Sequence, residues 1–153
     1  MWGTAPGNSI FSPTFRLRDG RDDSDLTFTE REAALLLEGL DDDVSFFWAL
    51  IHLGIRTASL TDLEPPGSEE IELAFRSFER LTAPGYCHIG HITYVDSGRE
   101  REGVVHVAEP LEAVRTRVET RCSDGSEDWV GSCWLVNTEE GNEALRSYLR
   151  LQA

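Results

Sequence analysis

The chain has 153 residues and a formal net charge of −14 at pH 7, because 28 acidic residues outnumber 14 basic ones. Hydrophobic residues make up 40% of the sequence, which is enough for one globular domain with its own core. No apolar run reaches the roughly 18 residues of a membrane helix, and the first residues lack the basic and apolar regions of a secretory signal. We therefore expect a cytoplasmic protein without membrane contact.

The negative net charge favours some classes of binding partner over others. An acidic surface repels nucleic-acid phosphates and acidic membranes, and it suits a basic protein partner or mimicry of nucleic acid. Every basic residue is arginine, which is typical of a GC-rich genome or of a halophile. Solubility or adaptation to high salt therefore explains the same charge without any partner, and both interpretations stay open from the sequence.

The N-terminal part differs in composition from the rest. Residues 1–25 hold few apolar side chains and are expected to form a flexible arm or an edge strand, in which Pro13 limits pairing. The acidic run 19–25 fails as an EF-hand calcium loop, because Phe28 occupies the position that requires glycine. Residues 26–153 are expected to form a single domain.

Two helices are predicted next. Thr29 and Glu32 have the spacing of a capping box, which predicts the start of the first helix. Its expected apolar stripe consists of Ala33, Leu36, Leu37 and Leu40. A second helix is predicted over 44–53, capped by one of the aspartates 41–43. It is apolar nearly all round, which is typical of a buried helix. Its expected outward face consists of Ser45, Ala49, His52 and Arg56. Trp48 is counted among its apolar residues, and which tryptophans are exposed receives no prediction.

The best-defined unit spans residues 65–95. A helix capped by Ser68 is predicted, and the pair Pro84-Gly85 ends it. Its buried stripe has helical spacing and consists of Ile71, Ala74, Phe75, Phe78 and Leu81. A strand follows over 86–95, in which successive side chains alternate between faces. His88 and His91 therefore point to opposite sides, which argues against a metal site formed by this pair.

The C-terminal third alternates strands and helices. A polar turn over 96–103 leads to a returning strand over 104–107, and a helix follows over 110–122 with proline at its start. Arg115, Arg117 and Arg121 make this helix locally basic. A strand is expected over 129–136, and Asn137 or Thr138 caps a last helix. The expected core face of that helix consists of Ala144, Leu145, Tyr148 and Leu149.

Two stretches, AFRSFERLTAPGY (74–86) and WLVNTEEGNEAL (134–145), resemble parts of winged helix-turn-helix domains. The resemblance implies an α+β, winged-helix-like fold: three N-terminal helices packed on a small antiparallel sheet, with an inserted helix and a C-terminal helix. It also implies a DNA-binding transcription regulator. The residues that would contact nucleic acid are Arg76, Arg80, Arg99, Arg101 and Arg115.

The helix that would enter a DNA groove carries four acids and two arginines, so a non-enzymatic interaction protein is the preferred prediction. A basic protein is the expected partner, as for an immunity or antitoxin-like inhibitor. The expected partner-binding residues are Glu69, Glu70, Glu72, Glu79, Asp41, Asp42 and Asp43. Neither a cofactor nor a metal is predicted, and the oligomeric state receives no prediction. The widely spaced Cys87, Cys122 and Cys133 are expected to be free, mostly buried thiols.

Overall fold

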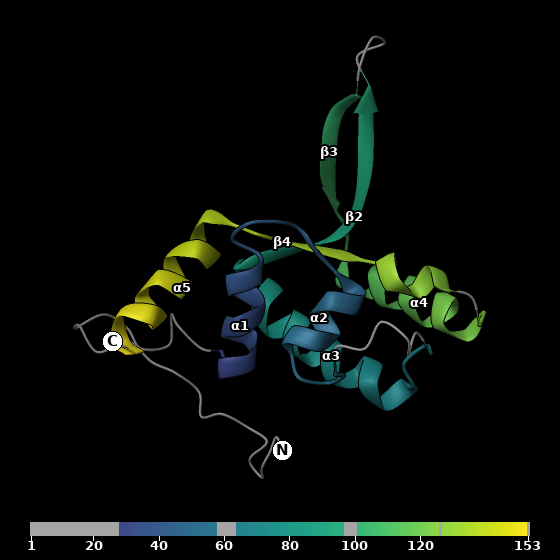
Figure 1. Ribbon diagram of the computed structural model, residues 1–153, viewed down its shortest axis with the longest axis horizontal. Coiled ribbons are helices and arrows are strands. Elements are labelled where there is room, and N and C mark those ends of the chain that lie inside the picture. Colours follow the sequence, from purple (N-terminus) through teal and green to yellow (C-terminus); the bar gives the residue numbers. More distant parts are fainter. Residues whose placement is uncertain (1–27, 58–63, 97–100, 126, 153) are drawn as a thin grey trace.

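A computed structural model describes residues 28–57, 64–96, 101–125 and 127–152, which form an α+β fold (Figure 1). This part contains five α-helices and a four-stranded antiparallel sheet with the order β1-β4-β2-β3. In chain order the elements are α1 (Glu30–Glu38), β1 (Val44–Ser45), α2 (Phe46–His52), α3 (Ser68–Thr82), β2 (Cys87–Asp96), β3 (Arg101–Ala108), α4 (Leu111–Ser123), the 3-10 helix η2 (Glu127–Gly131), β4 (Trp134–Asn137) and α5 (Glu139–Gln152).

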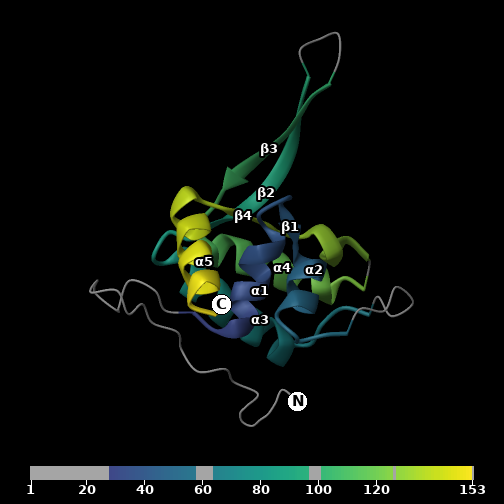
Figure 2. The same cartoon turned by 60° about the vertical axis from the view of Figure 1, so that its left-hand side comes forward.

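Strand β2 pairs with β4 over its first residues and with β3 over the rest. Its first residues pair with β4, from Cys87 opposite Asn137 to Gly90 opposite Trp134. Beyond Gly90 it pairs only with β3, and this hairpin projects away from the helices (Figures 1 and 2). A Cβ atom at Gly90 would lie 1.9 Å from the carbonyl oxygen of Val107, so the close approach of the two strands requires glycine there.

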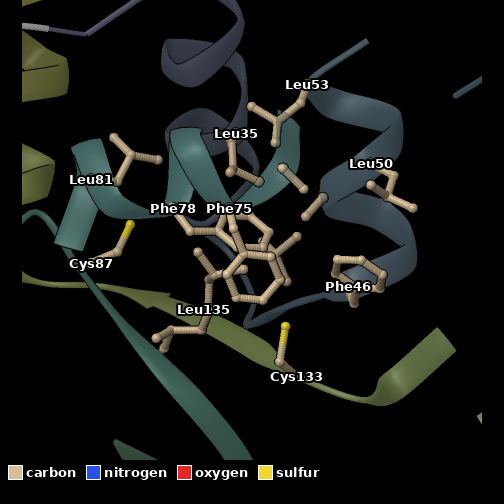
Figure 3. Packing of buried hydrophobic residues seen from close by; sticks show 14 of the residues in the cluster. Leu35, Phe46, Leu50, Leu53, Phe75, Phe78, Leu81, Cys87, Cys133 and Leu135 are labelled. Atoms are coloured by element: carbon tan, nitrogen blue, oxygen red, sulfur yellow. The ribbon is translucent and has the colours of Figure 1, made fainter. Parts of the chain in front are cut away.

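The core lies between the sheet and the helices α1, α2 and α3 (Figure 3). The predicted stripe of α3 is fully confirmed, because Ile71, Ala74, Phe75, Phe78 and Leu81 are all buried. Phe46 of α2 packs against this stripe, and its ring lies edge-on to Phe78 and Trp129. Such edge-to-face contacts add about 0.5–1.5 kcal/mol each to the stabilisation from burial.

Helix α1 begins at the predicted residue, but a different face of it is buried from the one that the sequence predicted. The Thr29 hydroxyl accepts from the Glu32 backbone N–H, and the Glu32 carboxylate accepts from the Thr29 N–H, which confirms the capping box. The prediction that Leu37 and Leu40 are buried was wrong, because they are 50% and 43% exposed. Glu32 and Leu35 turn inward instead, since α3 supplies polar partners for the Glu32 carboxylate.

The predicted helix 44–53 is shorter because its first two residues belong to the sheet. Val44 and Ser45 pair with Leu135 and Trp134 of β4, and Ser45 rather than an aspartate caps α2. This pairing fixes which side of α2 faces the core. Ser45 and Ala49 are buried, so the first half of the predicted outward face was wrong, whereas His52 and Arg56 are half-buried. Trp48 is 44% exposed.

Other boundaries also shifted in the structure. The predicted strand 129–136 is wrong in its first half, because η2 buries Trp129 and β4 begins only at Trp134. Gly67 rather than Ser68 caps α3, and Glu70 accepts its backbone N–H. Thr138 caps α5 by accepting the Gly141 N–H, while Leu149 is 42% exposed instead of buried. The predictions for residues 1–25 lie outside the described residues.

Candidate functional site

The acidic residues predicted to bind a partner fall into two groups. Glu70 and Glu72 are already engaged: Glu70 accepts the Gly67 N–H and a hydrogen bond from Arg56, and Glu72 accepts one from Arg115 at 2.6 Å. The others form no side-chain hydrogen bond or ion pair with the part of the chain that the structure describes. These unpaired acids are Glu69, Glu79, Asp41, Asp42 and Asp43.

Two of the predicted acids line a hollow of about 430 Å³ on the exposed face of α3. Its described lining consists of Ser68, Glu69, Glu72, Leu73 and Arg76. The spacing of residues 69, 72, 73 and 76 places them on one helical face, opposite the buried stripe. Leu73 is 43% exposed, so the hollow combines an apolar surface with carboxylates.

The charge on this face is held in its ionised form. Arg115 of α4 donates to Glu72 and lowers the pKa of that carboxyl group below its usual value. Arg76, one turn further along α3, lies 3.5 Å from the other Glu72 oxygen. Glu69 at the first turn is left as the unpaired carboxylate of the hollow, where the helix dipole also favours a negative charge.

The remaining predicted acids lie elsewhere. Asp41, Asp42 and Asp43 belong to the turn between α1 and β1, and Glu79 lies near the C-terminal end of α3. The exposed Trp48 of α2 stacks obliquely on His52, whose ring lies 3.5 Å from the Glu38 carboxylate of α1. This second surface combines an exposed aromatic ring with the Glu38 carboxylate. Trp48 was not among the predicted binding residues, because an all-apolar helix does not show from its sequence which side faces solvent.

The arginines predicted to contact nucleic acid do not form a free basic surface in the described residues. Arg80 donates twice to Glu32, at 2.8 and 2.6 Å, and Arg115 is shared between Glu72 and Glu119. Arg76 pairs with Glu72. Arg99 lies outside the described residues, and for Arg101 the structure gives only its backbone position at the start of β3.

Two buried or half-buried carboxylates were missed as organising residues. Glu32 has no exposed surface and accepts hydrogen bonds from Ser77 at 2.7 Å and from Arg80. Glu109, after β3, accepts two hydrogen bonds from Arg117 of α4, at 2.9 and 2.8 Å, and lies 3.1 Å from His91. The hydrogen bonds from Arg117 are the main reason why the pKa of Glu109 falls to about 2.

The cysteines are free and none is well exposed, as predicted. Burial raises the pKa of Cys87 to about 12 and that of Cys122 to about 11, and it raises the pKa of Cys133 as well. These thiols are therefore protonated at neutral pH and weakly nucleophilic. Within the described ranges, no three His, Cys, Asp or Glu side chains come together in a way that could hold a metal ion.

Comparisons with protein-family models, curated proteins and solved structures find no match for this chain. Among the described helices, none has both the length and the apolar character needed to cross a membrane.

Proposed function

We propose that this chain is a non-enzymatic interaction protein that binds a basic protein partner through the hollow on α3. An immunity or antitoxin-like inhibitor on a winged-helix-like scaffold is the specific class that we propose. The observation that carries the proposal is the hollow of about 430 Å³, in which the unpaired Glu69 adjoins the exposed Leu73.

The hollow suits the side chain of an arginine or a lysine. The aliphatic stem of such a side chain packs on Leu73, and its cationic head reaches the Glu69 carboxylate. The net charge of −14 adds long-range attraction, which raises the rate of association with a basic partner by ~10–10³. Contact at the hollow would then provide specificity for the partner, and the overall charge would raise the association rate.

The order of the elements supports the scaffold part of the proposal. Three helices precede the β2–β3 hairpin, which is the order of recognition helix and wing in winged-helix domains. On such a scaffold α3 would be the helix that enters a DNA groove, yet its exposed face carries Glu69 and Glu72. The DNA-binding alternative receives less support, because carboxylates already neutralise Arg76, Arg80 and Arg115.

A capture experiment with a matched control tests the protein-binding function. Purified wild-type protein, the double variant Glu69→Gln/Leu73→Ala and the control Glu139→Gln/Leu149→Ala are each incubated with native lysate. The control also removes an acid from the first turn of a helix and a leucine of equal exposure, 42% against 43%. We expect wild type and control to retain the same basic protein and the α3 variant to lose it.

Two outcomes would remove the proposal. One is that wild-type protein retains no basic protein at low salt, and the other is that the α3 variant retains it as well as the control does. A mobility-shift assay with promoter DNA at ~50 mM salt, where phosphate contacts are strongest, tests the alternative. A shifted band that disappears on replacing Arg101 with glutamine would favour DNA binding instead.

A further inference from the structure

Helix α4 presents its three arginines to two different neighbours. Arg115 reaches α3, whereas Arg117 and Arg121, one turn apart, face the base of the β2–β3 hairpin. There they line a cavity of about 320 Å³ between β2, α4 and the segment from η2 to β4. Its lining also includes His91, Ile92, Ser132 and Trp134.

The two arginines of this cavity differ in how their charges are used. Arg117 already has partners within the protein. It donates two hydrogen bonds to the Glu109 carboxylate in a bidentate pair, and a third to the backbone carbonyl of Ser132 at 2.8 Å. Arg121 is half-buried and forms no hydrogen bond or ion pair with the described part of the chain. The cavity therefore holds an uncompensated cation, in a chain whose net charge is −14.

A second group in the wall also lacks a partner. The indole of Trp134 lies over Gly131, where a Cβ atom would be 3.6 Å from its Nε1. This half-buried indole N–H, like the Arg121 guanidinium, donates to no acceptor in the described residues. An indole N–H and a guanidinium can only donate hydrogen bonds, so an anion that enters the cavity can accept hydrogen bonds from both side chains.

We propose that this cavity binds a small organic anion. Its carboxylate or phosphate group accepts hydrogen bonds from Arg121 and the Trp134 indole N–H, and its apolar part packs on Ile92 and the indole ring. The volume of about 320 Å³ falls at the lower end of the range for small-molecule sites. Arg117 and Glu109 keep the wall rigid, and the site is independent of the hollow on α3.

Nuclear magnetic resonance of the full chain tests the assignment. The probes are benzoate and phenyl phosphate, together with acetate and inorganic phosphate as anions without an aromatic part. The readout is the Trp134 indole N–H resonance, which is assigned from its absence in a Trp134→Phe variant. We expect a saturable shift with at least one aromatic anion at a Kd below about 1 mM, which corresponds to about 4 kcal/mol of binding free energy.

The variant Arg121→Gln removes the cation that has no described partner. Arg146→Gln is its control, because Arg146 lies on α5, away from the cavity, and pairs with Glu143. We expect Arg121→Gln to weaken binding at least tenfold while the remaining resonances stay in place, and Arg146→Gln to leave it unchanged. The ratio of benzoate to phenyl phosphate affinity separates a carboxylate ligand from a phosphate ester.

Three results would overturn this assignment. The first is equal binding by wild type and Arg121→Gln. The second is that no probe up to about 10 mM shifts the Trp134 resonance, a limit that corresponds to about 2.7 kcal/mol of binding free energy. The third is that acetate and inorganic phosphate bind as tightly as the aromatic anions, which would leave no role for Ile92 and the indole ring.

Discussion

The two ends of α3 use glutamate in opposite ways. Near the C-terminal end, Ser77 and Arg80 hold Glu32 of α1, whose carboxylate has no exposed surface. At the N-terminal end, Glu69 stands unpaired beside the exposed Leu73. One end fastens two helices together, and the other end leaves a charge available to a second molecule.

The difference shows that net charge alone does not locate a binding surface. A carboxylate that already accepts hydrogen bonds from an arginine has little to offer a partner, whereas an unpaired one retains its full charge. Glu32 and Glu109 belong to the first kind and Glu69 to the second. Removing these acids one at a time separates their contributions to the free energy of unfolding.

The largest effect is expected at Glu32. The change Glu32→Ala leaves Arg80 and Ser77 without their partner and removes the side-chain half of the capping box, so we expect unfolding to require about 3–5 kcal/mol less. Urea denaturation measures the change. Glu38→Ala on the same helix removes a carboxylate that is 50% exposed and should cost no more than about 0.5 kcal/mol. Equal losses for the two variants would contradict the structural role of Glu32.

A smaller loss is expected at Glu109. At pH 7, Glu109→Gln should lower the free energy of unfolding by about 1–3 kcal/mol, because Arg117 loses its charged acceptor. The folded protein lowers the pKa of Glu109 from 4.5 to about 2, so this stabilisation is present above pH 4.5 and is lost as the pH falls towards 2.

Denaturation of wild type and Glu109→Gln at several pH values between 7 and 2 tests this pH dependence. The two stabilities should converge as the medium becomes acidic. Glu112→Gln, an exposed acid at the start of α4, serves as the control and should leave the pH profile unchanged. A constant difference between wild type and Glu109→Gln across the whole range would contradict the assignment.

A still smaller effect is expected at Glu72, whose side chain is 43% exposed. Glu72→Gln removes the charged partner of Arg115 on α3, but Arg115 keeps Glu119 as a partner at 3.1 Å and still lies over the Phe75 ring of α3. The denaturation midpoint should fall slightly at low salt, and the difference should shrink in about 1 M salt because exposed pairs are screened. A loss as large as that of Glu109→Gln would show that Glu72 is structural.

The smallest change in stability is expected at Glu69, although the proposed effect on binding is the greatest there. Glu69→Gln should alter the free energy of unfolding by no more than about 0.5 kcal/mol, because the side chain has no partner to lose in the described residues. Calorimetry or urea denaturation checks this. A destabilisation above about 1 kcal/mol would assign Glu69 to the fold and weaken the proposed function.

The elements that could be predicted are those whose signals are local. The capping box of Thr29 and Glu32 and the buried stripe of α3 depend on spacings within one helix, and both are present as predicted. Trp48 and Trp129 look equivalent in the sequence, yet one is 44% exposed and the other has no exposed surface. The exposure of each side chain depends on how β1 pairs with β4 and on the turn formed by η2, and no local sequence pattern specifies either.

The sequence by itself determined the charge, the α+β class and the amphipathic face of α3, because composition and helical period act over a few residues. Only the tertiary structure decided which carboxylates are paired with an arginine and which are not. Glu32 and Arg80 are 48 residues apart in the chain. Arg121 has no partner among the described residues, whereas Arg117, one turn away, binds Glu109 and the Ser132 carbonyl. Pairing of charges depends on distances in space, and those are set when the helices pack on the sheet.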